Sequence, residues 1–343
     1  MKVEVPQTTS SSSVMNSPQQ TLAETFQPVL SDIQAIKKAL PSLIPCETEA
    51  AKRIIEHVTQ APGKCVRPAL YLLSCNLVNY QGPHRISMGA VCEYVHTASL
   101  LHDDVIDNSP IRRGKPAAQS LWGDEETILV GDLMYATASE LMANTGHLSI
   151  VKVYAAAIRH MSEAELLQLQ HLFNVSMPEK TYFHILRGKT GALMKAACSS
   201  AGYLANINEN LCFELGEFGM DLGLAFQLID DALDYKGEQD LFGKPTLADL
   251  KEGKITLPVI LLRDVMNSEE SQKFQNILAS STVSKEDIQW VAQLTEKYKT
   301  ADKTLERATE ITTRALKRLD KFPASDARNH LKSLAESLLN RQI

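Results

Sequence analysis

Aromatic residues, glycine, proline and long apolar runs are all scarce in this chain of 343 residues. Phe, Trp and Tyr make up 6 % of it, and there are 16 glycines and 14 prolines. No stretch approaches the roughly 20 consecutive apolar residues that a membrane-spanning helix needs, so no transmembrane segment is expected. Long β-branched runs with the alternating pattern of strands are missing as well. These absences argue against a membrane-spanning protein and against a β-rich fold.

Positive charge is also in short supply. The chain has 35 basic and 41 acidic residues, which gives a net charge of −6, and no basic stripe is present. This balance argues against nucleic acid as a partner. The six cysteines show no CxxC or CxxH spacing, and most lie among apolar residues, where a free thiol acts as a small core residue. We therefore expect a reducing, cytoplasmic location.

Apolar residues at intervals of three and four dominate the rest of the chain and predict an all-α protein. Residues 1–20 are rich in Ser, Gln and Pro, lack Arg and lack an apolar core. We expect them to form a flexible tail rather than a targeting peptide, and residues 21–343 to form one helical bundle around a central cavity. Helices are expected at 22–40, 48–60, 67–80, 85–107, 126–145, 148–170, 178–204 and 208–235 and from about 257 onward, with loops at 108–118 and 236–252.

Two acidic clusters of the same form are the most informative feature that is present. They are DDVID at 103–107 and DDALD at 230–234, each inside an apolar helical stretch. In a helix the first and last Asp of each cluster lie one turn apart on one face, where like charges repel and need a compensating cation. Two such faces opposite each other would supply the hard oxygen ligands that Mg²⁺ shares with a substrate diphosphate. The predicted metal ligands are Asp103, Asp104, Asp107, Asp230, Asp231 and Asp234. A single cluster of this kind is more often a solvated helix face, but two of them disfavour that interpretation.

A second set of candidate residues carries the opposite charge. Arg offers a planar fork that matches phosphate oxygens, and Lys offers a compact charge. Gly188 and Gly191 flank the lysine at 189 and are expected to loosen the helix there. The basic candidates are Lys64, Arg67, Arg112, Arg113, Lys189, Lys244 and Lys254.

These motifs resemble those of the trans-isoprenyl diphosphate synthases, the polyprenyl synthase family. A full second DDxxD favours chain elongation over terpene cyclisation. The chain departs from the family pattern at Leu247 and Ala248, where Gly and an acidic residue are common, and at Ala164, where Gly is expected. The resemblance spans about 63–260 and is carried by GKCVRP, HTASLLHDDVIDNSPIRRG, VGDLMYA, AELLQLQ, RGKTGAL, AFQLIDDALDY and GKPTLADLKEGKITLPVI.

The resemblance implies an Mg²⁺-dependent enzyme with two substrates, isopentenyl diphosphate and an allylic diphosphate, and a homodimeric assembly. The aspartates would hold several Mg²⁺ ions on the allylic diphosphate. Gln227 and Thr190 would line the reacting centre. His96 is either a polar contact to isopentenyl diphosphate or a core histidine. The allylic diphosphate would be bound by Arg112, Lys189, Lys244 and Lys254, and isopentenyl diphosphate by Lys64, Arg67 and Arg113.

Small residues lie one helical turn before the first aspartate cluster. In the family, bulky side chains at the positions of Ala98 and Ser99 close a floor that stops chain growth. Small ones leave a tunnel that extends by about 5.4 Å per helical turn. The resemblance therefore implies a long product, such as the side chain of a respiratory quinone. Alternatively, Ala98 and Ser99 only pack closely against a neighbouring helix, and the floor lies elsewhere.

Two other functions stay open at this point. A geranylgeranyl or farnesyl diphosphate synthase would use the same chemistry with a shallower tunnel. A subunit of a heteromeric synthase is the other alternative. Because such subunits tend to lose aspartates and this chain keeps all six, an active enzyme is favoured.

Overall fold

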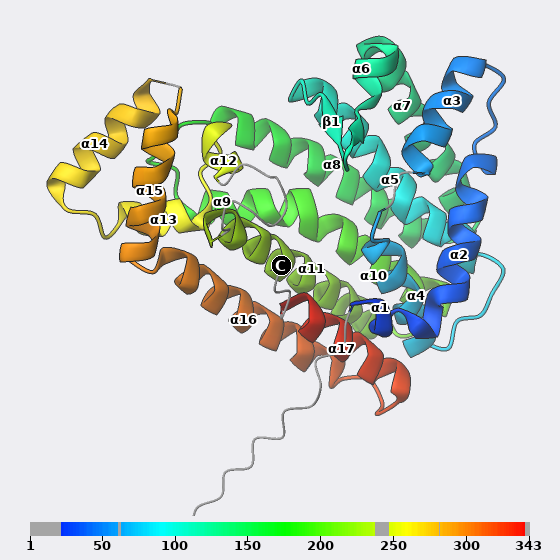
Figure 1. Ribbon diagram of the computed structural model, residues 1–343. Helices are drawn as coiled ribbons and strands as arrows, with labels where there is room; N and C mark the ends of the chain where they lie inside the picture. Colours follow the sequence, from blue (N-terminus) through cyan, green and yellow to red (C-terminus); the bar gives the residue numbers. More distant parts are fainter. Residues whose placement is uncertain (1–21, 61–62, 237–246, 281, 340–343) are drawn as a thin grey trace, which may run out of the picture.

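The computed structural model of the chain describes residues 22–60, 63–236, 247–280 and 282–339. The predicted tail 1–20 and Lys244 lie outside this part of the chain. Helices make up most of the described residues, as the apolar periodicity predicted, and they are arranged as a bundle (Figure 1). None of these helices is both long and apolar enough to cross a membrane.

The first half of the bundle surrounds the first acidic cluster. Its long members are α5, α7 and α8, and α5 packs against α4 and α7. The elements are α1 (Leu22–Thr25), η1 (Gln27–Val29), α2 (Leu30–Ala39), η2 (Leu40–Ser42), α3 (Glu49–Thr59), α4 (Val66–Leu77), α5 (Arg85–Ile106), β1 (Ile111–Arg112), β2 (Lys115–Pro116), α6 (Ala118–Trp122), α7 (Asp124–Ala143) and α8 (Leu148–Gln170).

The second half is built on α11, the longest helix, which carries the second acidic cluster. Both α10 and α16 pack along it, and α17 returns to the first half and contacts α4 (Figure 1). The elements are α9 (Glu179–Leu186), the π-helical turn η3 (Arg187–Gly191), α10 (Ala192–Leu204), α11 (Glu209–Lys236), α12 (Ala248–Lys251), α13 (Leu257–Arg263), α14 (Ser268–Ala279), α15 (Lys285–Lys297), α16 (Thr300–Leu319) and α17 (Asp326–Leu339).

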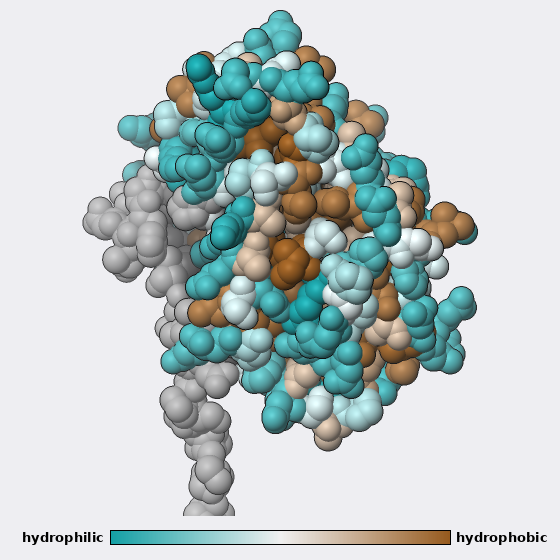
Figure 2. Space-filling model, turned by 90° about the vertical axis from the view of Figure 1, so that its right-hand side faces the viewer, coloured by the Kyte–Doolittle hydropathy of each residue, from teal (hydrophilic) through white to brown (hydrophobic). Residues whose placement is uncertain are grey.

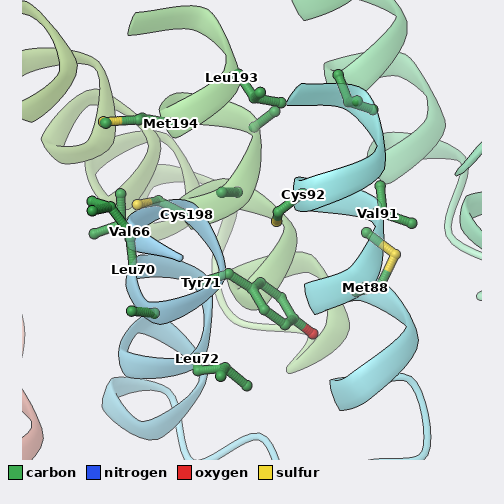
Figure 3. Packing of buried hydrophobic residues seen from close by; sticks show 14 of the residues in the cluster. Val66, Leu70, Tyr71, Leu72, Met88, Val91, Cys92, Leu193, Met194 and Cys198 are labelled. Carbon is green, nitrogen blue, oxygen red and sulfur yellow. The ribbon is translucent and has the colours of Figure 1, made fainter. Parts of the chain in front are cut away.

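The main hydrophobic core lies where α4, α5, α8 and α10 meet. Tyr71 of α4 directs its ring toward α5, where Met88 lies, and Leu193 and Cys198 approach from α10 (Figure 3). All four side chains are fully buried. Burial of side chains of this size contributes about 1.5–3 kcal/mol each, so this packing fixes the position of α5 and of the aspartates at its end.

On the face shown in Figure 2, hydrophilic side chains surround a central hydrophobic group.

Four segments differ from the sequence-based expectation. The predicted helix 22–40 is wrong as one element, because it is broken at Phe26 and at the 3₁₀ turn η1, where Pro28 lacks a backbone N–H. The predicted loop 108–118 contains a β-hairpin, in which Arg113 and Gly114 form the turn with φ of 50° and 74°. The predicted helix 178–204 is continuous but passes through the π-helical turn, as the flanking glycines suggested. Part of the predicted loop 236–252 is helical, because α12 occupies Ala248–Lys251.

Candidate active site

The first acidic cluster occupies the last turn of α5. Asp107 is the C-cap residue of this helix and is exposed, whereas Asp103 is half-buried. Asp104 is 3 % exposed, and its Oδ1 accepts a hydrogen bond of 2.6 Å from Nε of Arg112 and another from the second nitrogen of the same guanidinium. The middle carboxylate of the cluster therefore holds Arg112.

The second acidic cluster lies near the end of α11. Asp231 is 3 % exposed and accepts hydrogen bonds from the hydroxyl of Tyr182 (2.5 Å) and the amide nitrogen of Gln227 (2.9 Å). Asp234 accepts from the backbone N–H groups of Ala248 (3.1 Å) and Asp249 (3.2 Å) at the start of α12. The second cluster thus anchors both α9 and α12.

The two clusters share one pattern of exposure. Successive helical residues are about 100° apart, so the second aspartate of each cluster cannot share a face with the first. Asp104 and Asp231 accordingly point into the protein, while Asp103, Asp107 and Asp230 are more accessible. We predicted all six aspartates as metal ligands, and the structure gives the two middle ones other partners. The role of all six aspartates as metal ligands stays a prediction.

Lys254 links the two clusters in space. Its Nζ lies 4.0 Å from Oδ2 of Asp107, and its backbone N–H donates to the carbonyl of Asp249 (2.8 Å), which neighbours Asp234. A cavity of about 220 Å³ opens beside these contacts. It is lined by Gln168, His171, Met177, Tyr182, Ile185, Leu186, Lys189, Gln227, Asp231, Asp249, Lys254, Ile255 and Thr256.

The π-helical turn places Lys189 and Thr190 in this site. A Cβ atom at Gly188 would lie 2.5 Å from the backbone oxygen of His160, so only glycine lets the turn approach α8 this closely. At this separation Nζ of Lys189 lies 2.6 Å from Oε2 of Glu165. It also donates to Oε1 of Gln168 (3.2 Å). On the other side the hydroxyl of Thr190 donates to Oε1 of Gln227 (2.9 Å).

The carboxylates of this site are crowded and buried. The pKa of Asp103 is raised to about 6, mainly by burial and to a smaller extent by the negative charge of Glu165. Burial, followed by the charge of Asp249, raises the pKa of Asp231 to about 8. Burial and the charge of Asp234 raise the pKa of Asp249 to about 6. Burial disfavours the ionised form of each carboxyl, and a bound cation would stabilise that form.

The donor set fits a hard cation. The accessible carboxylate oxygens are the ligands that Mg²⁺ prefers. Within the residues that the structure describes, no group of three or more His, Cys, Asp or Glu side chains is arranged to hold a metal ion by itself. Water and substrate oxygens would have to complete the coordination, which is the usual mode for Mg²⁺.

The remaining basic candidates form a separate group beside α5. The guanidinium of Arg113 is so close to Gly63 that a Cβ atom there would lie 2.8 Å from one of its nitrogens. Nε of Arg67 is buried and has no hydrogen-bond partner. The pKa of His96 is lowered well below its usual value. Burial is the main cause, and the positive charges of Arg67, Arg113 and Arg112 add to it. Such a group favours an anion and keeps His96 neutral. Lys64 is exposed at its edge.

Sequence reasoning missed several residues of the site. Glu93 is 8 % exposed; burial raises its pKa, and the charges of Arg67, Arg113 and Lys37 oppose the rise. Glu93 lies one turn before His96 on the same face of α5, so helical periodicity could have found it. Tyr182 and Lys37 carried no signal, because a single Tyr or Lys in a helix is ordinary.

Ala98 and Ser99, the predicted determinants of product length, lie one turn below the first cluster. Ala98 is fully buried, and the hydroxyl of Ser99 donates to the backbone oxygen of His96 (2.9 Å). Neither residue lines the 220 Å³ cavity. Their role stays a prediction.

Comparison with known proteins agrees with the geometry of the site. The family model described as "Polyprenyl synthetase" matches residues 48–295. The chain belongs to the polyprenyl synthetase family. Octaprenyl diphosphate synthase of Escherichia coli is 30 % identical over 310 residues, which cover 90 % of this chain and 96 % of the relative.

Solved structures of the polyprenyl synthetase family share the fold. A decaprenyl diphosphate synthase from Rhodobacter capsulatus has a TM-score of 0.87 at 34 % identity, covering 93 % of this chain and 99 % of that one. A polyprenyl synthase from Caulobacter crescentus, in complex with calcium and isoprenyl diphosphate, has a TM-score of 0.89 at 31 % identity, with 95 % and 100 % covered. The family and the all-α fold that the motifs predicted are therefore confirmed.

Proposed function

We propose that the protein is an Mg²⁺-dependent prenyltransferase that condenses isopentenyl diphosphate with an allylic diphosphate, head to tail and in the trans configuration. The product is a long-chain polyprenyl diphosphate, a precursor of a quinone side chain. One observation carries this proposal: an acidic site on α5 and α11 lies beside a separate basic group, so two diphosphates can bind in two different ways. The printed names of the octaprenyl and decaprenyl relatives support the long product.

The allylic diphosphate would lie between the two acidic clusters. Asp103, Asp107 and Asp230 would hold magnesium there, and Asp104, Asp231 and Asp234 lie directly beside them. Bound magnesium would neutralise the charge that develops on the departing diphosphate. Lys189 and Lys254 line the cavity that Asp231 of the second cluster also lines, and their ammonium groups would bind the diphosphate oxygens. Lys244 would join them, and Arg112 would do so from its position on Asp104.

Isopentenyl diphosphate would bind to the basic group. Arg67 and Arg113 would each present a guanidinium fork to its phosphates, with Lys64 at the rim and neutral His96 as a hydrogen-bond partner. The buried, unpartnered Nε of Arg67 supports this assignment, since an anion would satisfy it.

The reaction then needs orientation and exclusion of water. The C–O bond of the allylic substrate breaks, and its electron pair leaves with diphosphate. The double bond of isopentenyl diphosphate attacks the allylic carbon, and a proton lost from the new chain restores a double bond. Thr190 and Gln227 would line this centre, where proximity supplies much of the rate. The departing diphosphate would accept this proton.

We also propose that the enzyme is a homodimer in the cytoplasm. Leu129 of α7 and Leu148 and Leu166 of α8 are more than 60 % exposed, which is unusual for leucine on these two neighbouring helices. A second copy would cover them. The six thiols are all free and five are buried, which supports a reducing compartment. The mass in solution, measured by light scattering, tests the dimer.

Sizing of products tests the function. The purified protein is incubated with Mg²⁺, labelled isopentenyl diphosphate and farnesyl diphosphate, and the dephosphorylated products are separated by length. We expect products well beyond C20, shortened in Ala98→Phe, and none in Asp103→Asn. Products that stop at C20 would replace the long-chain proposal by a geranylgeranyl diphosphate synthase. Absence of product with every allylic primer would indicate a missing partner subunit.

A further inference from the structure

Asp231 is the centre of a chain of hydrogen bonds that joins three elements. Tyr182 reaches it from α9 and Gln227 from the preceding turn of α11, at 2.5 and 2.9 Å. Gln227 in turn accepts from Thr190 of the π-helical turn at 2.9 Å. Tyr182, Thr190 and Asp231 are each at most 5 % exposed, and Gln227 is half-buried.

The hydrogen bonds of the structure set the direction of this chain. Oδ2 of Asp231 accepts from the hydroxyl of Tyr182, and Oδ1 accepts from the amide nitrogen of Gln227. The amide oxygen of Gln227 therefore faces Thr190, whose hydroxyl hydrogen points to Gln227. Without the carboxylate, nothing in this chain of bonds would stop the amide from turning over.

The chain of bonds reaches the cavity beside the proposed reacting centre. Tyr182, Gln227 and Asp231 line the same cavity of about 220 Å³ as Lys189, and Thr190 lies behind Gln227. The orientation of the Gln227 amide depends on the position of Asp231, whose other carboxylate oxygen is held by Tyr182.

We propose that Tyr182 is a positioning residue that, through Asp231, fixes the orientation of Gln227 and Thr190 at the reacting centre. Asp231 acts in this chain as an anchor rather than as a metal ligand. This inference rests on the proposed function, because it takes Gln227 and Thr190 as groups that face the substrates. Pre-organised dipoles act mainly on the chemical step, so loss of the anchor should lower kcat more than it raises KM.

The test compares Tyr182→Phe and Asp231→Asn with the wild type. Tyr182→Phe removes only the hydroxyl, and Asp231→Asn leaves one oxygen to accept from two donors. We expect kcat to fall at least about fivefold in both variants. The KM for isopentenyl diphosphate and the Mg²⁺ concentration for half-maximal rate should stay within about twofold of wild type. Tyr235→Phe is the matched control, since the hydroxyl of this buried tyrosine of α11 accepts a hydrogen bond from the hydroxyl of Thr256 (3.4 Å) and lies outside the chain of bonds through Asp231.

Two results would overturn the inference. One is a kcat of Tyr182→Phe within about twofold of wild type. The other is a large rise in the Mg²⁺ requirement of Asp231→Asn that Tyr182→Phe does not share, which would make Asp231 a metal ligand. Wild-type protein that is inactive with every primer would instead indicate a missing partner subunit and contradict the proposed homodimer. A crystal structure of either variant would then decide the inference: Gln227 turned away from Thr190 supports it, and an unchanged Gln227 refutes it.

Discussion

Leu247 adopts a backbone conformation that suits glycine, with φ of 57° and ψ of 43°. The sequence departs from the family pattern at this residue, where glycine is common. The left-handed conformation costs a residue with a Cβ atom about 1–2 kcal/mol. The leucine side chain is only 1 % exposed, and its burial contributes about 1.5–3 kcal/mol. Burial of the leucine side chain therefore offsets the strain, and the first backbone N–H groups of α12 keep their hydrogen bonds to Asp234.

Substitution of Leu247 separates the two effects. We expect Leu247→Gly and Leu247→Ala both to lower the free energy of unfolding, by about 1–4 kcal/mol, because each removes the buried side chain. Leu247→Gly should be the more stable of the two by about 0.5–1 kcal/mol, since alanine keeps the strain. Urea denaturation measures both. The opposite order would mean that the left-handed conformation is not present in solution.

At the scale of elements, the π-helical turn is defined by the small size of its glycines. A Cβ atom at Gly188 would lie 2.5 Å from the backbone oxygen of His160 and 2.5 Å from Cβ of Ala164, both on α8. Neither atom can rotate away. The separation of η3 and α8, and with it the 2.6 Å contact of Lys189 with Glu165, depends on this residue.

Gly188→Ala should therefore move Lys189 away from Glu165. We expect a loss of about 1–3 kcal/mol in stability from overpacking, and a fall in kcat of at least about tenfold. Gly216→Ala is the control: its new Cβ atom would meet Oγ of Ser199, a side-chain atom that can rotate. If both variants keep wild-type activity, the close approach of η3 to α8 does not position the lysine.

The hairpin β1–β2 is too short to be stable alone, because isolated two-stranded hairpins are marginal even when longer. The side chain of Gln119 ties its base to α5 by donating to the backbone oxygens of Ser109 (2.5 Å) and Asp104 (3.0 Å). A ring nitrogen of His57 donates to the oxygen of Pro116 (2.9 Å).

Gln119→Leu should loosen the hairpin and with it Arg113. We expect the KM for isopentenyl diphosphate to rise about fivefold to twentyfold, because Arg113 must then be ordered when substrate binds. Steady-state kinetics with both substrates measure this. Ser120→Ala is the control, because its hydroxyl makes only an exposed bond of 3.3 Å to Pro110. Equal KM values in the two variants would refute a role for Gln119 in holding the hairpin and Arg113 in place.

At the scale of the whole molecule, the buried carboxylates destabilise the protein when no cation is bound. The pKa values of about 6 for Asp103 and Asp249 and about 8 for Asp231 lie above the unfolded value near 4. The folded state then binds more protons than the unfolded state between about pH 4 and pH 8. By linkage, these three groups make the stability fall as the pH rises through that window.

We therefore expect the metal-free protein to lose at least ~2 °C of Tm between pH 5 and pH 8. Magnesium should raise the Tm more at pH 8 than at pH 5, because it binds the ionised carboxylates. Thermal unfolding with EDTA or with Mg²⁺ measures both. Asp231→Asn should flatten the upper half of the slope, between pH 6 and pH 8. A Tm that rises steadily with pH would contradict the buried positions of these carboxylates.

The sequence by itself determined the fold class and the family, and it predicted the acidic and basic residues of the site. Helical periodicity is local, so the elements could be found without the fold, and the spacing of DDVID and DDALD put their outer aspartates on one helix face. The two glycines around Lys189 predicted the irregular turn, which the structure confirms.

Only the tertiary structure decided how the six aspartates differ. In the sequence Asp104 and Asp231 look the same as the other aspartates. In the structure both are buried: Asp104 accepts hydrogen bonds from Arg112, and Asp231 accepts them from Tyr182 and Gln227. Arg112 comes from the hairpin after α5, Gln227 from the preceding turn of α11, and Tyr182 from α9, 49 residues before Asp231. Which carboxylate meets which partner depends on how these elements pack, and the local pattern of the acidic clusters carries no information about it.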